Sequence, residues 1–225
     1  MSGLTNKKYL TLFLLFLGVL TYILFGASFS SYFFQDDWFS LQISTVSSIL
    51  DVFRFFIPRT DVIYYRPLGM QFIFFLFQKL FYFIGIDPLP FRMATFLIHI
   101  VNGYLVYRIL SFIHKNEKVG MFSAVLYISA AVHFTIFYWA ATIAFAMAPF
   151  FYFGAFLFFL EKKNKLSLSF FILGLFTNEL LITFPAIIFT WSLLQNKKQL
   201  KETLWFWVIF ACYVGARFIL FKPPT

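Results

Sequence analysis

The most constraining feature of this sequence is a series of long apolar runs that are separated by short basic clusters. A membrane-spanning helix needs roughly 20 consecutive apolar residues. Seven runs reach or approach that length: 9–28, 67–85, 93–113, 119–134, 141–160, 166–194 and 203–220. Only 12% of the residues are charged, whereas a soluble domain carries roughly a quarter. We therefore predict an all-α fold, a polytopic transmembrane helical bundle in contact with membrane lipid.

Four basic clusters predict how the chain is oriented in the membrane. They are Lys7-Lys8, His114–Lys118, Glu161–Lys165 and Asn196–Lys201. Cytoplasmic loops are enriched in Lys and Arg, so we expect all four clusters and the N-terminus on the cytoplasmic side. The net charge of +9 is then explained by membrane orientation, and we expect no nucleic-acid partner.

If all four basic clusters are cytoplasmic, the chain crosses the membrane an even number of times between neighbouring clusters. This requirement decides how we interpret two of the runs. The 166–194 run should be a hairpin of two short helices, with its apex near Thr177-Asn178-Glu179. Three runs lie between the first and second clusters, so one of them does not cross. We assign 67–85, which carries Gln71, Gln78 and Lys79, to the outer face as an interfacial or re-entrant helix. The alternative makes it a true span and places the later clusters outside.

This topology predicts one transmembrane module over 1–225, with about seven crossings and the C-terminus outside. A long outer loop of about 29–92 follows the first helix and contains interfacial helices. The short loops favour a bacterial plasma membrane. The charged residues of the outer loop are Asp36, Asp37, Asp51, Arg54, Arg59, Asp61, Arg66, Lys79, Asp87 and Arg92.

The acidic residues are segregated between the two sides of the predicted membrane. Of the nine in the chain, Glu117, Glu161 and Glu202 lie in or beside the basic clusters, where they need no function. The other six fall on the outer side, which points to chemistry there. The single cysteine, Cys212, argues against a disulfide framework or a Cys-ligated metal site. No metal-ligand spacing, phosphate-binding glycine loop or serine-nucleophile elbow is evident.

The Asp36-Asp37 pair just past the first helix is the sharpest of these outer elements. Adjacent residues cannot share one helix face, so one carboxylate can point into a cavity while the other orients it or binds a cation. A carboxylate near an apolar wall has a raised pKa and can act as a general base. The alternative is a pair at the start of a loop, exposed to water.

Two further elements suggest anion binding and an intramembrane acid. Arg66 precedes Pro67, which holds it extended, and its guanidinium could clamp a phosphate at headgroup depth. The alternative is a Tyr/Arg interfacial anchor together with Tyr65.

Asn178 and Glu179 interrupt an apolar run, and an intramembrane carboxylate is a functional candidate by default. The alternative there is a polar cap at a tight hairpin.

Two aromatic and polar groups are candidates for a pocket. His99 and Asn102 share one helix face, and interhelical hydrogen bonds suit them better than ligand binding. His133 and Trp139 lie at the second outer turn, where they could line a sugar pocket. An aromatic belt at the membrane surface explains Trp139 equally well.

Taken in order, these elements resemble the GT-C glycosyltransferases, in particular the N-terminal conserved module. That superfamily includes the protein O-mannosyltransferases, the aminoarabinose transferases of lipid A and the catalytic subunits of oligosaccharyltransferase. The resemblance rests on an acidic pair after the first helix, the Tyr65–Leu68 stretch, the His99-x-x-Asn102 pair and the Asn178-Glu179 step. Related enzymes often have Lys-Glu at this last step.

The resemblance implies transfer of a sugar from a polyprenyl-phosphate donor to a hydroxyl of an acceptor glycan, lipid or protein on the extracytoplasmic face. It implies that Asp36 takes the acceptor proton with support from Asp37. It further implies that Arg66 holds the donor phosphate and that Glu179 completes the cavity, with Tyr65 and Asn178 beside them. Whether a divalent cation takes part is left open.

The chain departs from the family in length, because its members usually have more helices or a further outer domain. It ends at Lys222–Thr225, where the next outer loop would begin, so we expect a fragment or a reduced member. Non-catalytic alternatives are a flippase, a transporter subunit or a scaffold that handles lipid-linked glycans. Transporters keep ionisable residues along a mid-membrane pathway, whereas the acids here gather at one surface.

Overall fold

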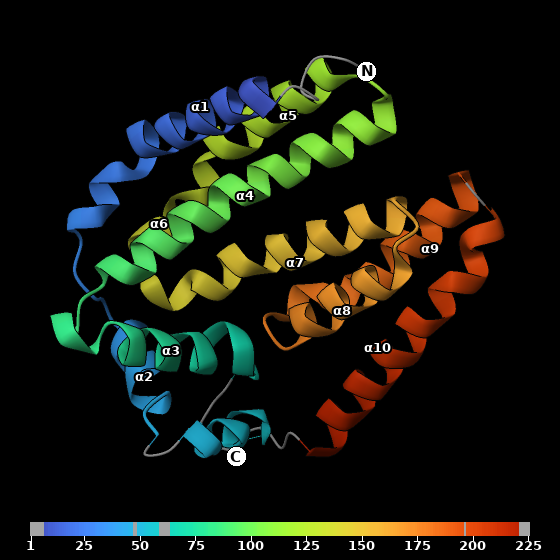
Figure 1. Cartoon of the computed structure of the whole chain (residues 1–225). Helices are drawn as coiled ribbons and strands as arrows, with labels where there is room; N and C mark the ends of the chain where they lie inside the picture. Colours follow the sequence, from blue (N-terminus) through green and yellow to red (C-terminus); the bar gives the residue numbers. More distant parts are fainter. Residues whose placement is uncertain (1–6, 47–48, 59–63, 196, 221–225) are drawn as a thin grey trace.

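The computed structural model describes residues 7–46, 49–58, 64–195 and 197–220, and every regular element among them is helical. The predicted all-α fold is therefore confirmed for the described part of the chain. The long helices are α1 (Lys7–Phe25), α4 (Leu89–His114), α5 (Glu117–Ser129), α7 (Ile143–Leu160), α8 (Asn164–Leu175), α9 (Phe184–Gln195) and α10 (Leu200–Leu220). The short ones are α2 (Asp36–Ile43), α3 (Ile73–Leu80) and α6 (Phe134–Tyr138). Figure 1 shows α2 and α3 together beside one end of the long helices.

Within the described ranges, four helical segments are long and apolar enough to cross a membrane: Lys8–Ser30, Leu89–His114, Ala140–Leu160 and Lys197–Leu220. A fifth is present if Glu117–Ser129 and Ala131–Tyr138, which meet at a 47° bend, form one broken span. The chain is thus a multi-pass membrane protein by the length and composition of its helices. The predicted seven crossings exceed this number and stay a prediction.

The 166–194 run folds as two short helical pieces with a break between them. Helix α8 ends at Leu175, and a 3-10 turn, η7 (Glu179–Thr183), leads into α9. The side chain of Asn178 accepts a hydrogen bond from the Leu180 amide at 3.0 Å and so caps η7. The 12 residues of α8 rise only about 18 Å, well short of the roughly 30 Å hydrocarbon core.

The 67–85 run lies beside one end of the long helices (Figure 1) and is not one of the candidate spans. It begins as a π-helix, Pro67–Phe72, and continues into α3. Gln78 on α3 donates to the carbonyl oxygen of Leu41 at 3.2 Å and to Ser44 Oγ at 2.7 Å, which joins α3 to α2. Its position at the outer face stays a prediction.

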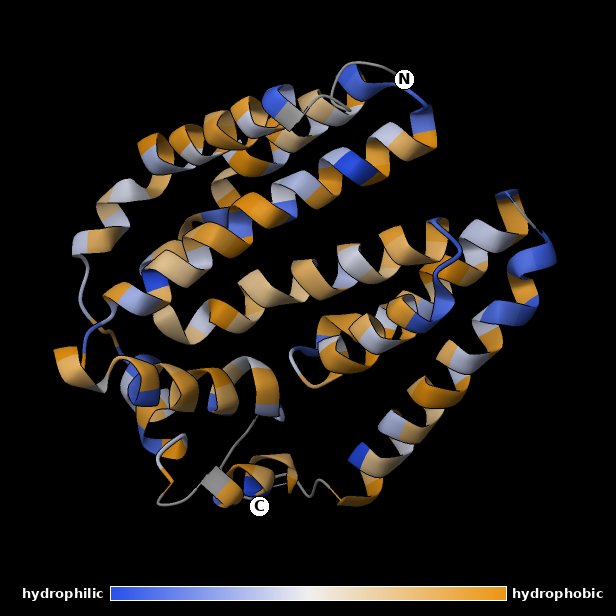
Figure 2. Cartoon of the chain, in the orientation of Figure 1, coloured by the Kyte–Doolittle hydropathy of each residue, from blue (hydrophilic) through white to orange (hydrophobic). Residues whose placement is uncertain are grey.

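Both ends of the bundle are charged, but with different residues. At one end, Arg108 near the C-terminus of α4 contacts Glu161 after α7 at 2.7 Å, and Asn164 of α8 hydrogen-bonds Glu202 of α10. The described residues of the four basic clusters lie toward this end, which Figure 2 shows as blue helix ends at the top and right of the view. Helices α2 and α3 and the α8–η7 turn lie toward the other end (Figure 1).

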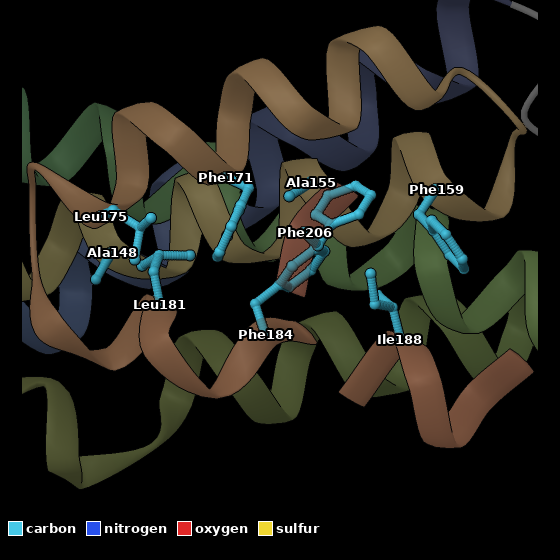
Figure 3. Packing of buried hydrophobic residues seen from close by; sticks show 9 residues of the cluster. All are labelled: Ala148, Ala155, Phe159, Phe171, Leu175, Leu181, Phe184, Ile188 and Phe206. Atoms are coloured by element: carbon cyan, nitrogen blue, oxygen red, sulfur yellow. The ribbon is translucent and has the colours of Figure 1, made fainter. Parts of the chain in front are cut away.

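A cluster of buried apolar side chains holds the α8–α9 hairpin against its neighbours (Figure 3). Phe171 of α8 packs against Phe184 of α9 at 5.5 Å between ring centroids, and both contact Phe206 of α10. Ala148 and Ala155 bring α7 into the same cluster. Small residues let membrane helices approach closely, so this core fixes where the hairpin turn meets the rest of the chain.

Candidate functional site

A carboxylate between two guanidinium groups forms the centre of the candidate site. Arg66 Nε donates to Glu179 Oε2 at 2.7 Å, and Arg217 Nη2 donates to Glu179 Oε1 at 3.4 Å. The Arg66 side chain is 12% exposed, and those of Glu179 and Arg217 are 24% and 27% exposed. These three side chains, the cationic cluster, carry one net positive charge in a partly desolvated place.

Contacts of the backbone and of aromatic rings set the position of Arg66. The amide of Leu68 donates to the carbonyl oxygen of Phe176 at 3.0 Å, which docks the π-helix on the α8–η7 turn. The Arg66 guanidinium lies over the rings of Tyr64 and Phe145, at 4.6 and 4.8 Å from their centroids. Cation–π contacts of this kind orient a planar guanidinium, so its direction is restrained from two sides.

Gly69 allows this docking to be close. A Cβ atom added at Gly69 would lie 2.4 Å from the carbonyl oxygen of Thr177 and 2.8 Å from the Cβ of Ala144. Neither the Thr177 backbone nor the short Ala144 side chain, which is fixed to the α7 backbone, can yield cheaply at these distances. The glycine therefore permits the π-helix, the hairpin turn and α7 to meet where Arg66 reaches Glu179.

An apolar groove of about 410 Å³ adjoins the cationic cluster. Arg217, Tyr213 and Cys212 line it from α10, and Tyr65 lines it from the segment before the π-helix. Further lining comes from Phe56, Pro58, Ile172, Leu175, Phe176 and Ile209. The groove can hold a hydrocarbon chain while Arg217 offers a charge to its polar end.

Tyr65 is held in the groove wall as a neutral phenol. Its hydroxyl donates to the carbonyl oxygen of Phe56 at 2.8 Å. Burial raises the pKa of Tyr65 above its ordinary value, and the neighbouring Tyr213 acts in the same direction, while Arg217 opposes them. The phenol is thus a hydrogen-bonding group rather than a base.

Of the candidates named from the sequence, the structure brings Arg66 into contact with Glu179 and places Tyr65 in the wall of the adjoining groove. It adds Arg217, which sequence reasoning missed. Asn178 lies beside them as a buried cap of η7. The signal for Arg217 was present, because a single Arg interrupts the 203–220 apolar run and such residues are functional candidates.

The two carboxylates of the acidic pair lie in different environments. Asp37 is fully buried; its Oδ2 accepts from the Phe34 amide at 2.9 Å and its Oδ1 from the Ala141 amide at 2.5 Å. Burial raises the pKa of the Asp37 carboxyl above its ordinary value, and these amide bonds and the Arg92 charge act against that rise. Asp36 is exposed. Asp37 is therefore an anchor for the backbone, and Asp36 is the carboxylate open to solvent.

Arg92 is a second residue whose place sequence reasoning did not foresee. Its side chain is buried, and Nη1 donates to the Phe137 carbonyl oxygen at 2.6 Å while Nη2 donates to that of Tyr32 at 3.4 Å. Arg92 therefore joins the first turn of α4 to α6 and to the segment before α2. It is a positioning residue for the Asp37 region.

The 3-10 turn Ala140–Thr142 and the first turn of α7 connect the acidic pair to the cationic cluster. Asp37 accepts the amide of Ala141, and Arg66 lies over the ring of Phe145. These two positions are four residues apart, or about 6 Å along a helix axis. Both candidate elements thus lie at the same end of the molecule.

His99 and Asn102 make the interhelical contacts that their spacing predicts. His99 Nε2 lies 3.3 Å from the carbonyl oxygen of Ile128, and Asn102 Nδ2 donates to that of Ala146 at 2.9 Å. The rings of His99 and His133 are 4.5 Å apart. These residues form a buried cluster of their own between α4, α5 and α7, while Trp139 packs on Phe34 at 6.2 Å.

The remaining outer-loop charges are either peripheral or outside the described residues. Asp51 pairs with the exposed Arg54 at 3.2 Å. Arg59 and Asp61 lie outside the described residues. Within the described ranges, no group of three or more His, Cys, Asp or Glu side chains could hold a metal ion.

Comparison with family models, with curated proteins and with solved structures finds no match for this chain. The functional argument therefore rests on the geometry of the chain itself.

Proposed function

We propose that this chain is a membrane glycosyltransferase module that moves a sugar from a polyprenyl-phosphate donor to an acceptor hydroxyl on the extracytoplasmic face. The observation that carries the proposal is an apolar groove that shares Arg217 with a partly buried cluster of two guanidiniums. A polyprenyl phosphate has the same two parts, a long hydrocarbon chain and an anionic end.

The proposed topology has seven crossings, with the N-terminus in the cytoplasm of a bacterial cell. It is supported by the gathering of basic clusters at one end of the bundle, since such clusters stay on the cytoplasmic side. In this proposal the α8–α9 hairpin reaches the outer face at Asn178. Its two helices are each shorter than the hydrocarbon core, so they count as short crossings that the turns at their ends complete. The 67–85 segment lies on the outer face. The cationic cluster and the acidic pair face the extracytoplasmic headgroup region.

In the proposed reaction the acceptor oxygen attacks the anomeric carbon and the bond from that carbon to the phosphate oxygen breaks. Asp36 takes the proton of the acceptor hydroxyl, and the leaving phosphate keeps the electron pair of the broken bond. Arg66 and Arg217 stabilise the negative charge on that phosphate, because preorganised cations are most effective where charge develops. Glu179 holds the two guanidiniums together before the donor arrives. A single displacement of this kind would invert the anomeric carbon.

A scaffold that binds lipid-linked glycans without transfer is the second candidate. It is favoured by the position of Asp37, whose two oxygens are already engaged by backbone amides. A binding protein needs only the groove and the cationic cluster.

Donor binding can be measured at Cys212, the only cysteine of the chain, which lines the groove. Purified protein in maltoside detergent is treated with a maleimide, with and without polyprenyl phosphate. We expect the lipid to slow alkylation, and phosphate-free polyprenol to do so far less. Arg217→Gln removes one charge-assisted contact and should weaken protection about tenfold. Equal protection by both lipids would contradict a phosphate site.

Transfer separates the enzyme from the scaffold. Radiolabelled sugar transfer from a polyprenyl-phosphate donor extract is compared for the wild type and Asp36→Asn, after both are shown to fold and to protect Cys212 equally. Loss of transfer in the variant alone supports Asp36 as the base. Protection without transfer in the wild type indicates the scaffold, and equal transfer in both removes Asp36 from the mechanism.

A further inference from the structure

A second hollow, separate from the groove of the donor site, lies between the loop before α2, α3 and the start of α4. It encloses about 290 Å³, close to the lower limit of small-ligand sites. Its wall includes Phe33, Phe77, Phe81 and Phe91, together with Gln78 and Asp87. We name this hollow the aromatic pocket.

The rings of the aromatic pocket meet at steep angles rather than in a flat stack. Phe77 lies 4.9 Å from Phe91 and 5.9 Å from Phe81, at interplanar angles of 71° and 85°. Phe33 meets Phe91 at 5.8 Å and 76°. All four rings belong to residues that line the hollow, so their differently oriented planes border a common space. The negative potential of an aromatic face attracts a cation within about 6 Å.

Asp87 gives the pocket its only acidic side chain, and no cationic side chain is among the residues that line it. Asp87 Oδ1 accepts the Leu89 amide at 2.7 Å, which fixes the carboxylate at the start of α4. No ion pair of Asp87 occurs among the described residues. The pocket thus combines aromatic rings with a carboxylate for which the described residues supply no cationic partner.

We propose that the aromatic pocket binds an organic ammonium group, such as the headgroup of an ethanolamine or choline lipid. The rings surround the ammonium, and the Asp87 carboxylate neutralises it. The pocket is at the same end of the bundle as the acidic pair, because its Phe33 packs on Trp38 of α2 at 5.6 Å. This depth suits a lipid headgroup. The proposal stands whether or not the chain transfers a sugar.

The test follows the N-methyl proton signal of choline by NMR, with purified full-length protein in maltoside detergent that contains no ammonium. Binding against aromatic faces should shift this signal upfield through ring currents. We compare choline with its neutral isostere 3,3-dimethylbutan-1-ol and with the soluble lipid dihexanoylphosphatidylcholine. We expect choline and the lipid to bind and the neutral isostere to bind much less. Tighter binding by the lipid than by choline identifies a lipid headgroup as the source.

Two variants assign the binding to this pocket. Asp87→Asn keeps an oxygen that can accept the Leu89 amide, so α4 still begins normally while the charge is lost, and choline binding should weaken about tenfold. Phe77→Leu keeps apolar volume but removes a ring and should weaken it about fivefold. Asp51→Asn, outside the pocket lining, should leave binding unchanged. Equal binding of the neutral isostere, or no effect of Asp87→Asn, would overturn the proposal.

Discussion

At the scale of single residues, the candidate site depends on Glu179, whose carboxylate forms ion pairs with both Arg66 and Arg217. A buried or half-buried charge must be paired or it is costly, so Glu179 stabilises the two cations when no ligand is present. An anion that enters the groove can then share these guanidiniums. The same group of residues therefore pairs two cations with one carboxylate and supplies the charge that the proposed phosphate site requires.

Arg66→Lys should weaken polyprenyl-phosphate binding about tenfold while the protein stays folded. The planar guanidinium of Arg66 stacks on two aromatic rings and contacts Glu179 at the same time. A lysine ammonium is not planar and cannot make both kinds of contact. Protection of Cys212 from the maleimide measures this. Arg108→Lys, at the opposite end of the bundle and paired with Glu161, is the matched control and should leave protection unchanged. An equal loss in both variants would indicate a general effect on folding.

Asp37→Asn should lower the free energy of unfolding by about 1–3 kcal/mol. In the wild type both carboxylate oxygens accept backbone N–H groups. The Asn side chain replaces one of these oxygens with an NH2 group, which cannot accept, so one buried backbone N–H loses its partner. Asp36→Asn should leave stability unchanged, since Asp36 is exposed. Thermal unfolding of both variants in the same detergent compares the two. A destabilised Asp36→Asn with an unaffected Asp37→Asn would reverse the assigned roles.

At the scale of elements, the close contact between the π-helix and the α8–η7 turn decides whether the cationic cluster forms. Leu68 and Phe176 share a backbone hydrogen bond there, and Gly69 leaves no room for a side chain. Separation of these two elements would move Arg66 away from Glu179. Packing of the hairpin in the cluster around Phe171 and Phe206 keeps the turn in place.

Gly69→Ala should lower the melting temperature and weaken protection of Cys212, because its Cβ would lie 2.4 Å from the Thr177 carbonyl oxygen. Gly215→Ala on α10 is the matched control, since nothing lies within 4 Å of a Cβ there. Ala in a helix is more favourable than Gly by roughly 0.5–1 kcal/mol, so this control should be neutral or stabilising. A tolerated Gly69→Ala would show that the contact is looser.

At the scale of the whole molecule, the bundle keeps its basic clusters at one end and the candidate site at the other. Four or five of the described helices are long enough to span, and α3, α8 and α9 are shorter pieces packed beside them. The charge segregation gives the molecule a predicted direction in the membrane. In this predicted orientation, which stays a proposal, the candidate site is at the extracytoplasmic surface.

The orientation can be tested with single cysteines in a Cys212→Ser background and a membrane-impermeant maleimide on intact cells. Ile86→Cys and Leu180→Cys, both at exposed positions, should be labelled from outside. Lys197→Cys should be labelled only after lysis, because it belongs to a basic cluster. The opposite pattern would contradict a cytoplasmic N-terminus. Labelling of Leu180→Cys only after lysis would remove the two hairpin crossings.

The sequence by itself determined the helical class, the apolar runs, the break at Asn178 and the identity of Arg66, Tyr65 and Glu179 as candidates. These follow from local properties, since hydropathy, basic clusters and helix caps act within a few residues. Only the tertiary structure decided that Arg66 contacts Glu179, 113 residues away, and that Arg217 joins them. It also decided which carboxylate of the acidic pair is buried, namely that of Asp37. Such contacts depend on how helices pack around small residues such as Gly69, which no local pattern encodes.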